Sequence, residues 1–322
     1  MACKILQNQG LRVLGLHFIS PFFGQIKDMD QWMTKFGIDI LPLDIGQTFI
    51  DMLIKGPKWG FGKYLNPCID CKILMLKQTK TLLENFQAQF IVSGEVLGQR
   101  PMSQRRDSLH IVQRDAEVKD ILLRPLSAKI LPPTPMEKAG LVDRGNLCDI
   151  SGRGRKKQMT LARNLQLPEI PTPSGGCLLT EPESVKRFRS LFKHIPSPSL
   201  NDFQLSKIGR QFWSNSNWLI IGRNKTDNAK LLELVQTRDI VFKLTDIPGP
   251  LAIGRQLKKT WSDDIILKAA QFIVSFSTKA KQSRDPIRIK IVQAHRTMQE
   301  LHINQTSPYK QNIWQEPTGE DC

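Results

Sequence analysis

Residues 1–180 alternate short apolar runs with longer amphipathic stretches, and this order restricts the possible folds more than any other feature of the chain. The runs Leu11–Phe18, Ile38–Ile45 and Phe90–Gly94 have the length of strands and lack a polar face. The stretch Pro67–Phe86 places its apolar residues at helical spacing. Buried strands separated by helices predict an α/β domain with a parallel sheet, whose ligands bind beyond the carboxyl ends of the strands.

The pattern changes after the proline-rich segment Pro196–Ser199. Beyond it, short strands separated by turns rich in Asn, Asp and Pro indicate a compact α+β domain. Arg223–Asn228 is expected to be a turn before a helix at Ala229–Gln236, and a longer helix is expected at Asp263–Lys281, with Ser262 as its cap. The tail from Thr306 is expected to be loosely ordered.

A chain of 322 residues is long enough for two domains. The predicted division is an α/β domain over residues 1–182, a linker region over residues 183–200, and a smaller α+β domain over residues 201–322. No apolar run approaches the roughly 18 residues that a membrane-spanning helix needs. The start of the chain also lacks the cationic and then apolar build of a secretion signal, so we expect a cytoplasmic protein without a membrane partner.

The charge of the chain indicates a polyanionic partner. Its 46 Lys and Arg exceed its 30 Asp and Glu, and a formal charge of +16 favours RNA. One basic cluster, Lys186, Arg187 and Arg189, is expected to be a solvated helix face. The basic residues expected to contact an RNA backbone are Arg100, Arg105, Arg106, Arg153, Arg155, Lys156 and Lys157.

Three cysteines are the strongest candidates for chemistry. Cys68 and Cys71 follow an Asn-Pro pair typical of a helix start, where the helix dipole is expected to lower a thiol pKa, and Cys177 follows two glycines. Three thiolates suit an iron–sulfur cluster with one open iron, whereas a closed zinc site normally needs four ligands. Cys148 is the candidate for a fourth ligand, although its surroundings are more typical of an inert core thiol.

A polar loop after the third apolar run is the second candidate. Gly94 and Gly98 permit close backbone approach to a phosphate or a ribose, and Glu95 is suited to a magnesium ion or a hydroxyl. Taken alone, the segment is more simply interpreted as a polar loop between a strand and a helix.

Four segments of the first domain, taken in order, resemble the ThiI-like tRNA thiouridine synthetases of the PP-loop ATP pyrophosphatase superfamily. The resemblance covers roughly residues 1–180 and implies a parallel-sheet PP-loop domain, which is an adenine nucleotide alpha hydrolase-like fold. The segments are Asn66-Pro67-Cys68-Ile69-Asp70-Cys71-Lys72, Gly94-Glu95-Val96-Leu97-Gly98-Gln99, Leu123-Arg124-Pro125-Leu126-Ser127-Ala128-Lys129 and Gly175-Gly176-Cys177.

This resemblance implies a tRNA sulfurtransferase, in which ATP adenylates a uridine carbonyl, pyrophosphate leaves, and sulfur then displaces AMP. It implies ATP, Mg²⁺ and a [4Fe-4S] cluster, or a cysteine persulfide in place of the cluster, with a sulfur donor protein or sulfide as the source. The implied catalytic residues are Cys68, Cys71, Cys177 and Asp70, with the three cysteines as metal ligands. The implied cofactor-binding residues are His17, Phe18, Gly94, Glu95 and Gln99, although His17 also fits a satisfied core histidine.

The second domain resembles the NFACT RNA-binding domain. The resemblance rests on Ile221-Gly222-Arg223-Asn224 with Asn228, on Asp246-Ile247-Pro248-Gly249-Pro250, and on the helix end Ser277–Lys281. The chain departs from that pattern where Val241-Phe242-Lys243 replaces an aromatic and histidine-bearing strand, and where Pro250 replaces a serine. The resemblance implies RNA contacts by Arg223 and Asn224.

The PP-loop motif Ser-Gly-Gly-x-Asp-Ser does not occur in the sequence, and Ala2–Leu6 matches the helix that should follow it. If Met1 is the true start, we expect thiolation by this chain to be weak or absent. Two alternatives remain open. One is a non-catalytic RNA-binding protein, and the other is a structural zinc protein that uses Cys68, Cys71 and Cys177 with Cys148 or a histidine.

Overall fold

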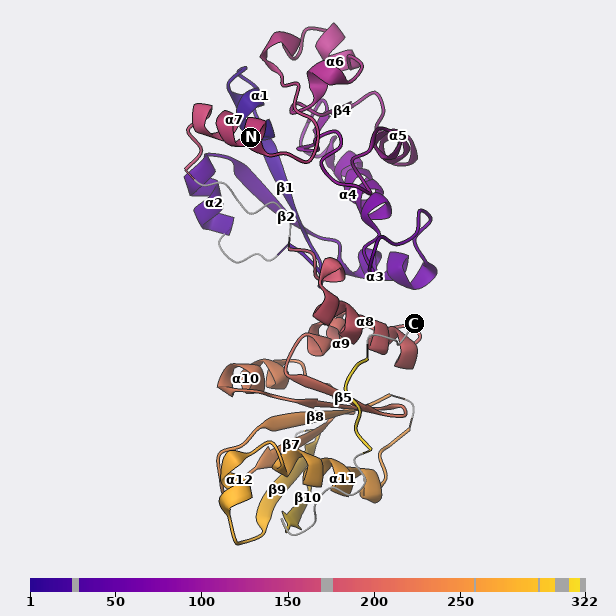
Figure 1. The fold of residues 1–322 in the computed structure, drawn as a ribbon, viewed down its shortest axis with the longest axis vertical. Coiled ribbons are helices and arrows are strands. Elements are labelled where there is room, and N and C mark those ends of the chain that lie inside the picture. The colour runs from indigo at the N-terminus through magenta and orange to yellow at the C-terminus, as the bar shows by residue number, and fades with distance from the viewer. Residues whose placement is uncertain (25–28, 169–175, 258, 295, 305–312, 319–322) are drawn as a thin grey trace. The chain divides into compact units, whose positions relative to one another are not determined.

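The chain divides into two compact units, Met1–Thr180 and Glu181–Cys322, each described here by itself (Figure 1). The computed structural model describes residues 1–24, 29–168, 176–257, 259–294, 296–304 and 313–318. Residues 183–200, expected to be a linker, form most of helix α8 (Pro182–His194) and the start of helix α9 (Leu200–Ser206) in the second unit. They fold because Pro182 starts α8 and because Val185, Phe188 and Leu191 bury one helical face.

Two parallel strand pairs organise the first unit. Strand β1 (Leu14–Ile19) pairs with β2 (Asp39–Asp44), and β3 (Ile91–Val92) pairs with β4 (Leu122–Leu123). All but β4 fall within or next to the predicted apolar runs. Among the described residues the pairs form two separate two-stranded sheets, so the single parallel sheet of a PP-loop domain stays a prediction.

Helices fill the rest of the first unit. The longest in the described part of the chain, α4, has 15 residues, and no described helix combines the length and the apolar character needed to cross a bilayer. The helices are α1 (Ala2–Gln7), α2 (Met29–Phe36), α3 (Gly46–Lys55), α4 (Cys68–Leu82), α5 (Arg106–Asp115), α6 (Pro135–Lys138) and α7 (Lys156–Asn164), with 3-10 turns η1 (Ala128–Ile130), η2 (Arg144–Asn146) and η3 (Leu178–Thr180).

Two apolar clusters hold the first unit together. In one, Ile73 of α4 packs with Ile91 of β3 and Val112 of α5. In the other, Leu6 of α1 packs with Val96 and its neighbours. Because Ile91 and Val96 belong to different clusters, the loop that follows β3 is anchored at both sides, and this anchoring positions the polar residues between them.

The second unit is built on a six-stranded sheet of order β10-β9-β7-β8-β6-β5, in which all neighbours pair antiparallel. The second unit thus combines an antiparallel sheet with helices. Its elements after α8 and α9 are β5 (Arg210–Ser214), β6 (Asn217–Ile221), α10 (Lys225–Glu233), β7 (Ile240–Leu244), β8 (Leu251–Gln256), α11 (Asp263–Val274), α12 (Thr278–Gln282), β9 (Ile287–Gln293) and β10 (Arg296–Ile303).

Helices cover the two faces of this sheet differently. On one face, Phe242 of β7 and Ile289 of β9 belong to a cluster with Ala269 and Ile273 of α11. Helices α8, α9 and α10 lie near the β5 end of the sheet (Figure 1). Away from that end, Lys243 of β7 is exposed and stands directly opposite Lys290 of β9.

Two helix boundaries differ from the predicted ones because capping side chains determine where these helices begin. Helix α10 begins at Lys225, four residues before the predicted start, because the Asn224 side chain accepts a hydrogen bond from the Asp227 N–H. The helix predicted at Asp263–Lys281 divides into α11 and α12, because Ser277 caps α12 by accepting from the Ala280 N–H. Ser262 caps α11 as predicted.

Part of the tail is ordered against the second unit, contrary to expectation. Trp314 is 4% exposed and packs against Trp261, with ring centroids 5.5 Å apart. Gln315 pairs with Trp213 of the edge strand β5 through backbone hydrogen bonds of 2.8 and 2.9 Å. Residues 305–312 and 319–322 lie outside the described residues.

Candidate functional site

The structure brings the three predicted cysteines into one neighbourhood of the first unit. Cys68 and Cys71 occupy the first turn of α4, as their spacing predicts. Cys177 directly precedes η3 and is positioned by the Leu178 N–H, which donates to the Phe22 carbonyl at 2.9 Å. The thiols are near enough for the charge of one to affect the pKa of another. Gly175, which belongs to the same motif, lies outside the described residues.

Burial, rather than the helix start, dominates the ionisation of Cys71 and Cys177. Burial raises the pKa of Cys71 to about 12, with Lys72 opposing and the neighbouring cysteines adding to the rise. Burial also raises the pKa of Cys177, although the Leu179 N–H and Arg100 act against it. The expectation that the helix dipole lowers the thiol pKa is therefore wrong for Cys71. Burial destabilises the thiolate by more than the helix dipole stabilises it.

The thiols do not form a complete metal site. Across the described ranges, no three His, Cys, Asp or Glu side chains converge closely enough to hold one metal ion. The Cys68 Sγ accepts a hydrogen bond from Asn66 Nδ2 at 3.1 Å. Cys148, the candidate fourth ligand, lines a pocket of about 580 Å³ together with Lys129. Within the described part of the chain, these residues as they stand do not fit a zinc or iron–sulfur centre.

Asp70 holds the cysteine helix in place. It is 8% exposed, and its two carboxylate oxygens accept hydrogen bonds from the N–H groups of Lys58 and Trp59, both at 3.0 Å. These two hydrogen bonds connect the first turn of α4 to the preceding loop, so Asp70 positions the helix. Each oxygen can accept a further hydrogen bond, and the expected catalytic role stays a prediction.

The loop after β3 holds a buried carboxylate. Glu95 is 2% exposed, and its Oε2 accepts from Arg124 Nε at 3.0 Å. Its Oε1 is buried without a hydrogen-bond partner among the described residues, which is costly for an ionised group. The space where a side chain at Gly94 would lie is open, and Gln99 bonds to Gln158 at 2.8 Å. A bound cation or hydroxyl would satisfy the remaining Glu95 oxygen.

The expected cofactor-binding residues His17 and Phe18 lie within β1. They stand opposite Pro42 and Leu43 of β2. The His17 ring meets Trp32 edge-on, with centroids 5.6 Å apart. This contact favours the alternative that His17 is satisfied within the fold.

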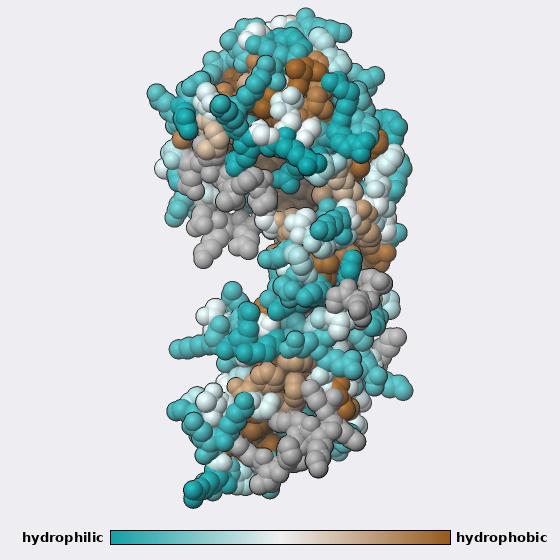
Figure 2. Space-filling model, in the orientation of Figure 1, coloured by the Kyte–Doolittle hydropathy of each residue, from teal (hydrophilic) through white to brown (hydrophobic). Residues whose placement is uncertain are grey.

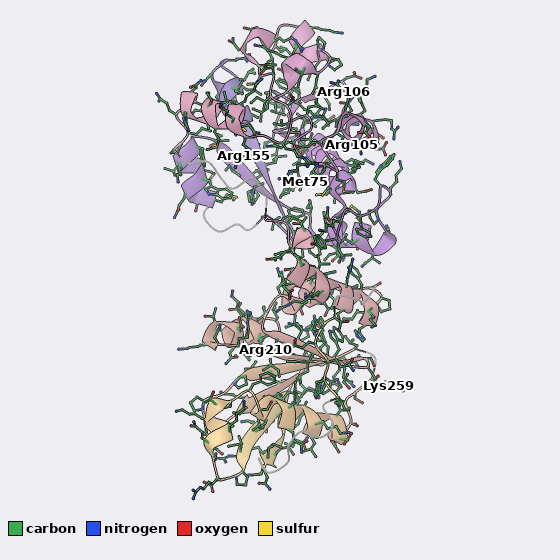
Figure 3. All side chains as sticks on the ribbon, in the orientation of Figure 1. Met75, Arg105, Arg106, Arg155, Arg210 and Lys259 are labelled. Carbon is green, nitrogen blue, oxygen red and sulfur yellow. The ribbon has the colours of Figure 1, made fainter. Side chains whose placement is uncertain are left out.

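The predicted basic residues of the first unit lie on separate elements (Figure 3). Arg105 and Arg106 stand at the start of α5, where Arg105 is 3.3 Å from Asp107. The cluster at residues 153–157 leads into α7, where Lys157 is 3.1 Å from Asp149. These two ion pairs offset part of the positive charge of each group. Arg100 lies in neither group and instead acts on the pKa of Cys177.

The glycine after β6 is required by packing. A Cβ at Gly222 would lie 2.0 Å from the Asn228 Oδ1. That oxygen accepts a hydrogen bond of 3.2 Å from the Leu251 N–H at the start of β8. The motif that carries the resemblance in this region thus includes residues that join α10 to the sheet, in addition to any that meet a ligand.

Of the two predicted RNA contacts in the second unit, Arg223 is partly exposed and pairs with Asp227, and the side-chain oxygen of Asn224 caps α10. The Arg223 side chain is 48% exposed, and its Nε lies 2.7 Å from Asp227 Oδ2. This pair lowers the pKa of Asp227 and raises that of Arg223. Arg187, expected on a solvated face, is half-buried and donates to the carbonyls of Ser206 and Gly209 at 3.1 and 3.2 Å.

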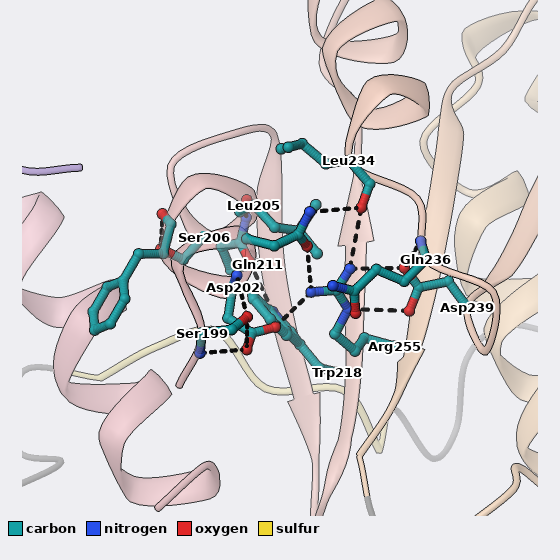
Figure 4. A network of polar contacts seen from close by, with 12 residues as sticks. Ser199, Asp202, Leu205, Ser206, Gln211, Trp218, Leu234, Gln236, Asp239 and Arg255 are labelled. Atoms are coloured by element: carbon teal, nitrogen blue, oxygen red, sulfur yellow. Dashed lines mark hydrogen bonds and ion pairs between the residues drawn. The ribbon is translucent and has the colours of Figure 1, made fainter. Parts of the chain in front are cut away.

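A buried arginine joins the sheet to α9 (Figure 4). Arg255 is 3% exposed and donates to both Asp239 oxygens, at 3.0 and 2.7 Å, and to Asp202 and Asn201 of α9. It also donates to the Leu234 carbonyl at 3.2 Å. Its donors are thus committed within the protein, so the adjoining pocket of about 710 Å³ gains no anion-binding group from it. Sequence reasoning missed this network because its acids lie far from residue 255 in the chain.

Comparison with known proteins finds a family match within the second unit. The family model described as the NFACT protein RNA binding domain matches residues 209–315. No curated protein matches the chain. A solved structure, the C-terminal part of the fibronectin/fibrinogen-binding protein from Streptococcus suis, is 12% identical over 81% of this chain and 95% of that chain. Its TM-score is 0.26, which adds nothing to the assignment of the fold.

Proposed function

We propose that the protein binds RNA through its second unit. The observation that carries this proposal is the match of residues 209–315 to an RNA-binding domain. Charge supports it, because residues 181–322 carry 22 Lys and Arg against 14 Asp and Glu, which gives +8, half of the formal +16 of the chain. We infer that the RNA is tRNA, because the first unit resembles enzymes that modify tRNA.

Binding of labelled tRNA to the full chain tests this proposal. Fluorescence anisotropy should show that the protein binds tRNA. The logarithm of the association constant should fall linearly with the logarithm of the salt concentration, since phosphate contacts release counterions. Unlabelled tRNA should compete, and a neutral polymer of similar size should not. No binding at about 50 mM salt, where electrostatic attraction is strong, would contradict an RNA-binding role.

A second function, ATP-dependent thiolation of a tRNA uridine, is proposed for the first unit. It is supported by the gathering of Cys68, Cys71 and Cys177 from two separate segments. ATP and Mg²⁺ are the proposed cofactors, with Glu95 as a group that a cation or hydroxyl would satisfy. Because the thiols do not converge on one point, a cysteine persulfide suits the present geometry better than an iron–sulfur cluster.

Thiolation is tested with ATP, Mg²⁺, tRNA, a protein that donates sulfane sulfur from its own persulfide, and a thiol that reduces the disulfide left after sulfur transfer, followed by mass spectrometry of the nucleosides. Thiouridine that forms only in the presence of ATP would support the proposed function, and its absence would contradict it. Any thiouridine that forms should disappear in Cys177→Ser, and an equal yield from that variant would contradict a role for the thiol. Metal analysis after anaerobic purification separates the alternatives: iron with acid-labile sulfide supports a cluster, and zinc without sulfide supports a structural site.

A further inference from the structure

We propose that the phosphates of RNA bind one basic surface of the second unit, where α8, the α9–β5 turn and the β6–α10 turn meet. The inference rests on the proposed RNA-binding function and names the face that performs it. This surface, called the α10 surface below, is made up of Arg187, Lys207, Arg223, Lys225 and Lys230.

Two glycines bring the segments of the α10 surface together. Gly209 has a φ of +65°, and a Cβ there would lie 2.4 Å from the Ile221 carbonyl oxygen and 3.4 Å from the Gly222 nitrogen. The α9–β5 turn therefore lies directly against the β6–α10 turn, an approach that a side chain at residue 209 would prevent. Arg187 donates to the Gly209 carbonyl at 3.2 Å, so it is held beside the turn that carries Arg223.

Like charges lie side by side on this surface. Arg223 adds to the effect of burial in lowering the pKa of Arg187, and Lys230 does the same for Lys207. Glu183, Asp227 and Glu181 lie near Arg187 and oppose this effect, and Asp227 is also paired with Arg223. Partly desolvated cations of one sign, held together by the backbone, favour a bound anion, because the anion stabilises each protonated form.

The exposed part of the surface suits a chain of phosphates. Lys225 and Lys230 are exposed on α10, and hydrophilic side chains gather over this helix (Figure 2). Arg223 is held by Asp227, which fixes its guanidinium before a ligand arrives. Arginine and lysine spread over three neighbouring segments match successive phosphates better than a single small anion. RNA is also the partner that the match of residues 209–315 indicates.

The inference is tested with Lys225→Gln/Lys230→Gln in the full chain and labelled tRNA as the probe. The matched control is Lys243→Gln/Lys290→Gln, which removes the same charge from the exposed part of the sheet face. We expect the α10 variant to bind roughly tenfold more weakly and to lower the salt slope by about 2, since each phosphate contact contributes about one unit. The control should stay close to the wild type.

Each of the other outcomes would contradict a different part of the proposal. Equal affinity and slope in wild type and the α10 variant would overturn the assigned surface while leaving RNA binding intact. A larger loss in the control than in the α10 variant would move the site to the sheet face. Absence of tRNA binding in the wild type would remove the proposed function and the surface with it. Competition by a polyglutamate peptide as effective as that by unlabelled tRNA would overturn RNA as the ligand.

Discussion

Arg255 shows how a single side chain determines the packing of several elements. Two carboxylates, Asp202 and Asp239, face one guanidinium at a site from which water is largely excluded. A buried ion pair adds little over a well-packed apolar group, since desolvation offsets the Coulomb attraction. Removing one partner is different, because the remaining charge then stays buried without compensation.

Replacing this arginine should therefore be costly. We expect Arg255→Met to lower the free energy of unfolding by about 3–5 kcal/mol, because Asp239 and Asp202 lose their counterion. Urea unfolding followed by tryptophan fluorescence measures this, since four of the six tryptophans lie in the second unit. Lys243→Met, an exposed position on the adjacent strand, is the control and should change stability little. A loss below about 1 kcal/mol for Arg255→Met would contradict the network.

A methyl group at Gly222 tests the close packing after β6. Gly222→Ala should destabilise the second unit by about 1–3 kcal/mol, because Asn228 must move and release the Leu251 N–H. Gly154→Ala is the matched control, since the space beside Gly154 is open and its φ is not positive. Equal unfolding midpoints in the two variants would show that Asn228 adjusts without cost.

At the scale of elements, α10 depends on its first turn. Asn224 caps the helix, and Asp227 places a carboxylate near the positive end of the helix dipole while pairing with Arg223. Both interactions need an ionised or polar group at a defined position, so the start of α10 responds to pH.

The pKa of Asp227 predicts the direction of this response. Its pairing with Arg223 lowers the pKa from the ordinary value of 3.8. Its contribution to stability is therefore fully present above the unfolded-state pKa and is lost as the pH falls through the lower folded-state pKa. The difference in unfolding free energy between wild type and Asp227→Asn should stay constant from about pH 7 to 5 and shrink below about pH 4. A difference that grows toward acid pH would contradict this assignment.

Local sequence patterns predict much of the secondary structure. They predict little of the pairing between elements that lie far apart in the sequence. Strands β7 and β8 lie in the region for which short strands separated by turns are predicted, because turn residues bound their apolar runs. The sequence also predicts the Ser262 cap, since capping depends on residues that are close in the sequence. The acids that meet Arg255 and the carbonyls that meet Arg187 come from other elements, and no local signal identifies them. The cysteine neighbourhood was anticipated, but burial of its thiols depends on the completed fold.

For the whole molecule, the second unit is larger than the region that matches the NFACT RNA-binding domain. The matched region begins at residue 209, whereas the compact unit begins at Glu181. The additional helices α8 and α9 supply Arg187, Asn201 and Asp202, which bond to the matched part. Without these two helices, the buried Arg255 of the matched region would lose two of its hydrogen-bond partners.

Fragments of the chain test this dependence. We expect residues 181–322 to unfold cooperatively, and residues 209–322 to be poorly folded because Arg255 loses two of its partners and the sheet loses its cover from α8 and α9. Near-ultraviolet circular dichroism and hydrogen exchange measure the difference. Native-like spectra and equal protection in the shorter fragment would contradict it.

The pairing of Gln315 with the edge strand β5 has a consequence for biosynthesis. Trp213 emerges from the ribosome long before Gln315, so the strand edge stays unpaired while the intervening chain is made. An unpaired edge can join another nascent chain, and strands that are distant in sequence pair slowly. We therefore expect the binding of ribosome-associated chaperones to the nascent chain to be strongest before residues 313–315 are synthesised. It should fall once Gln315 pairs with the β5 edge.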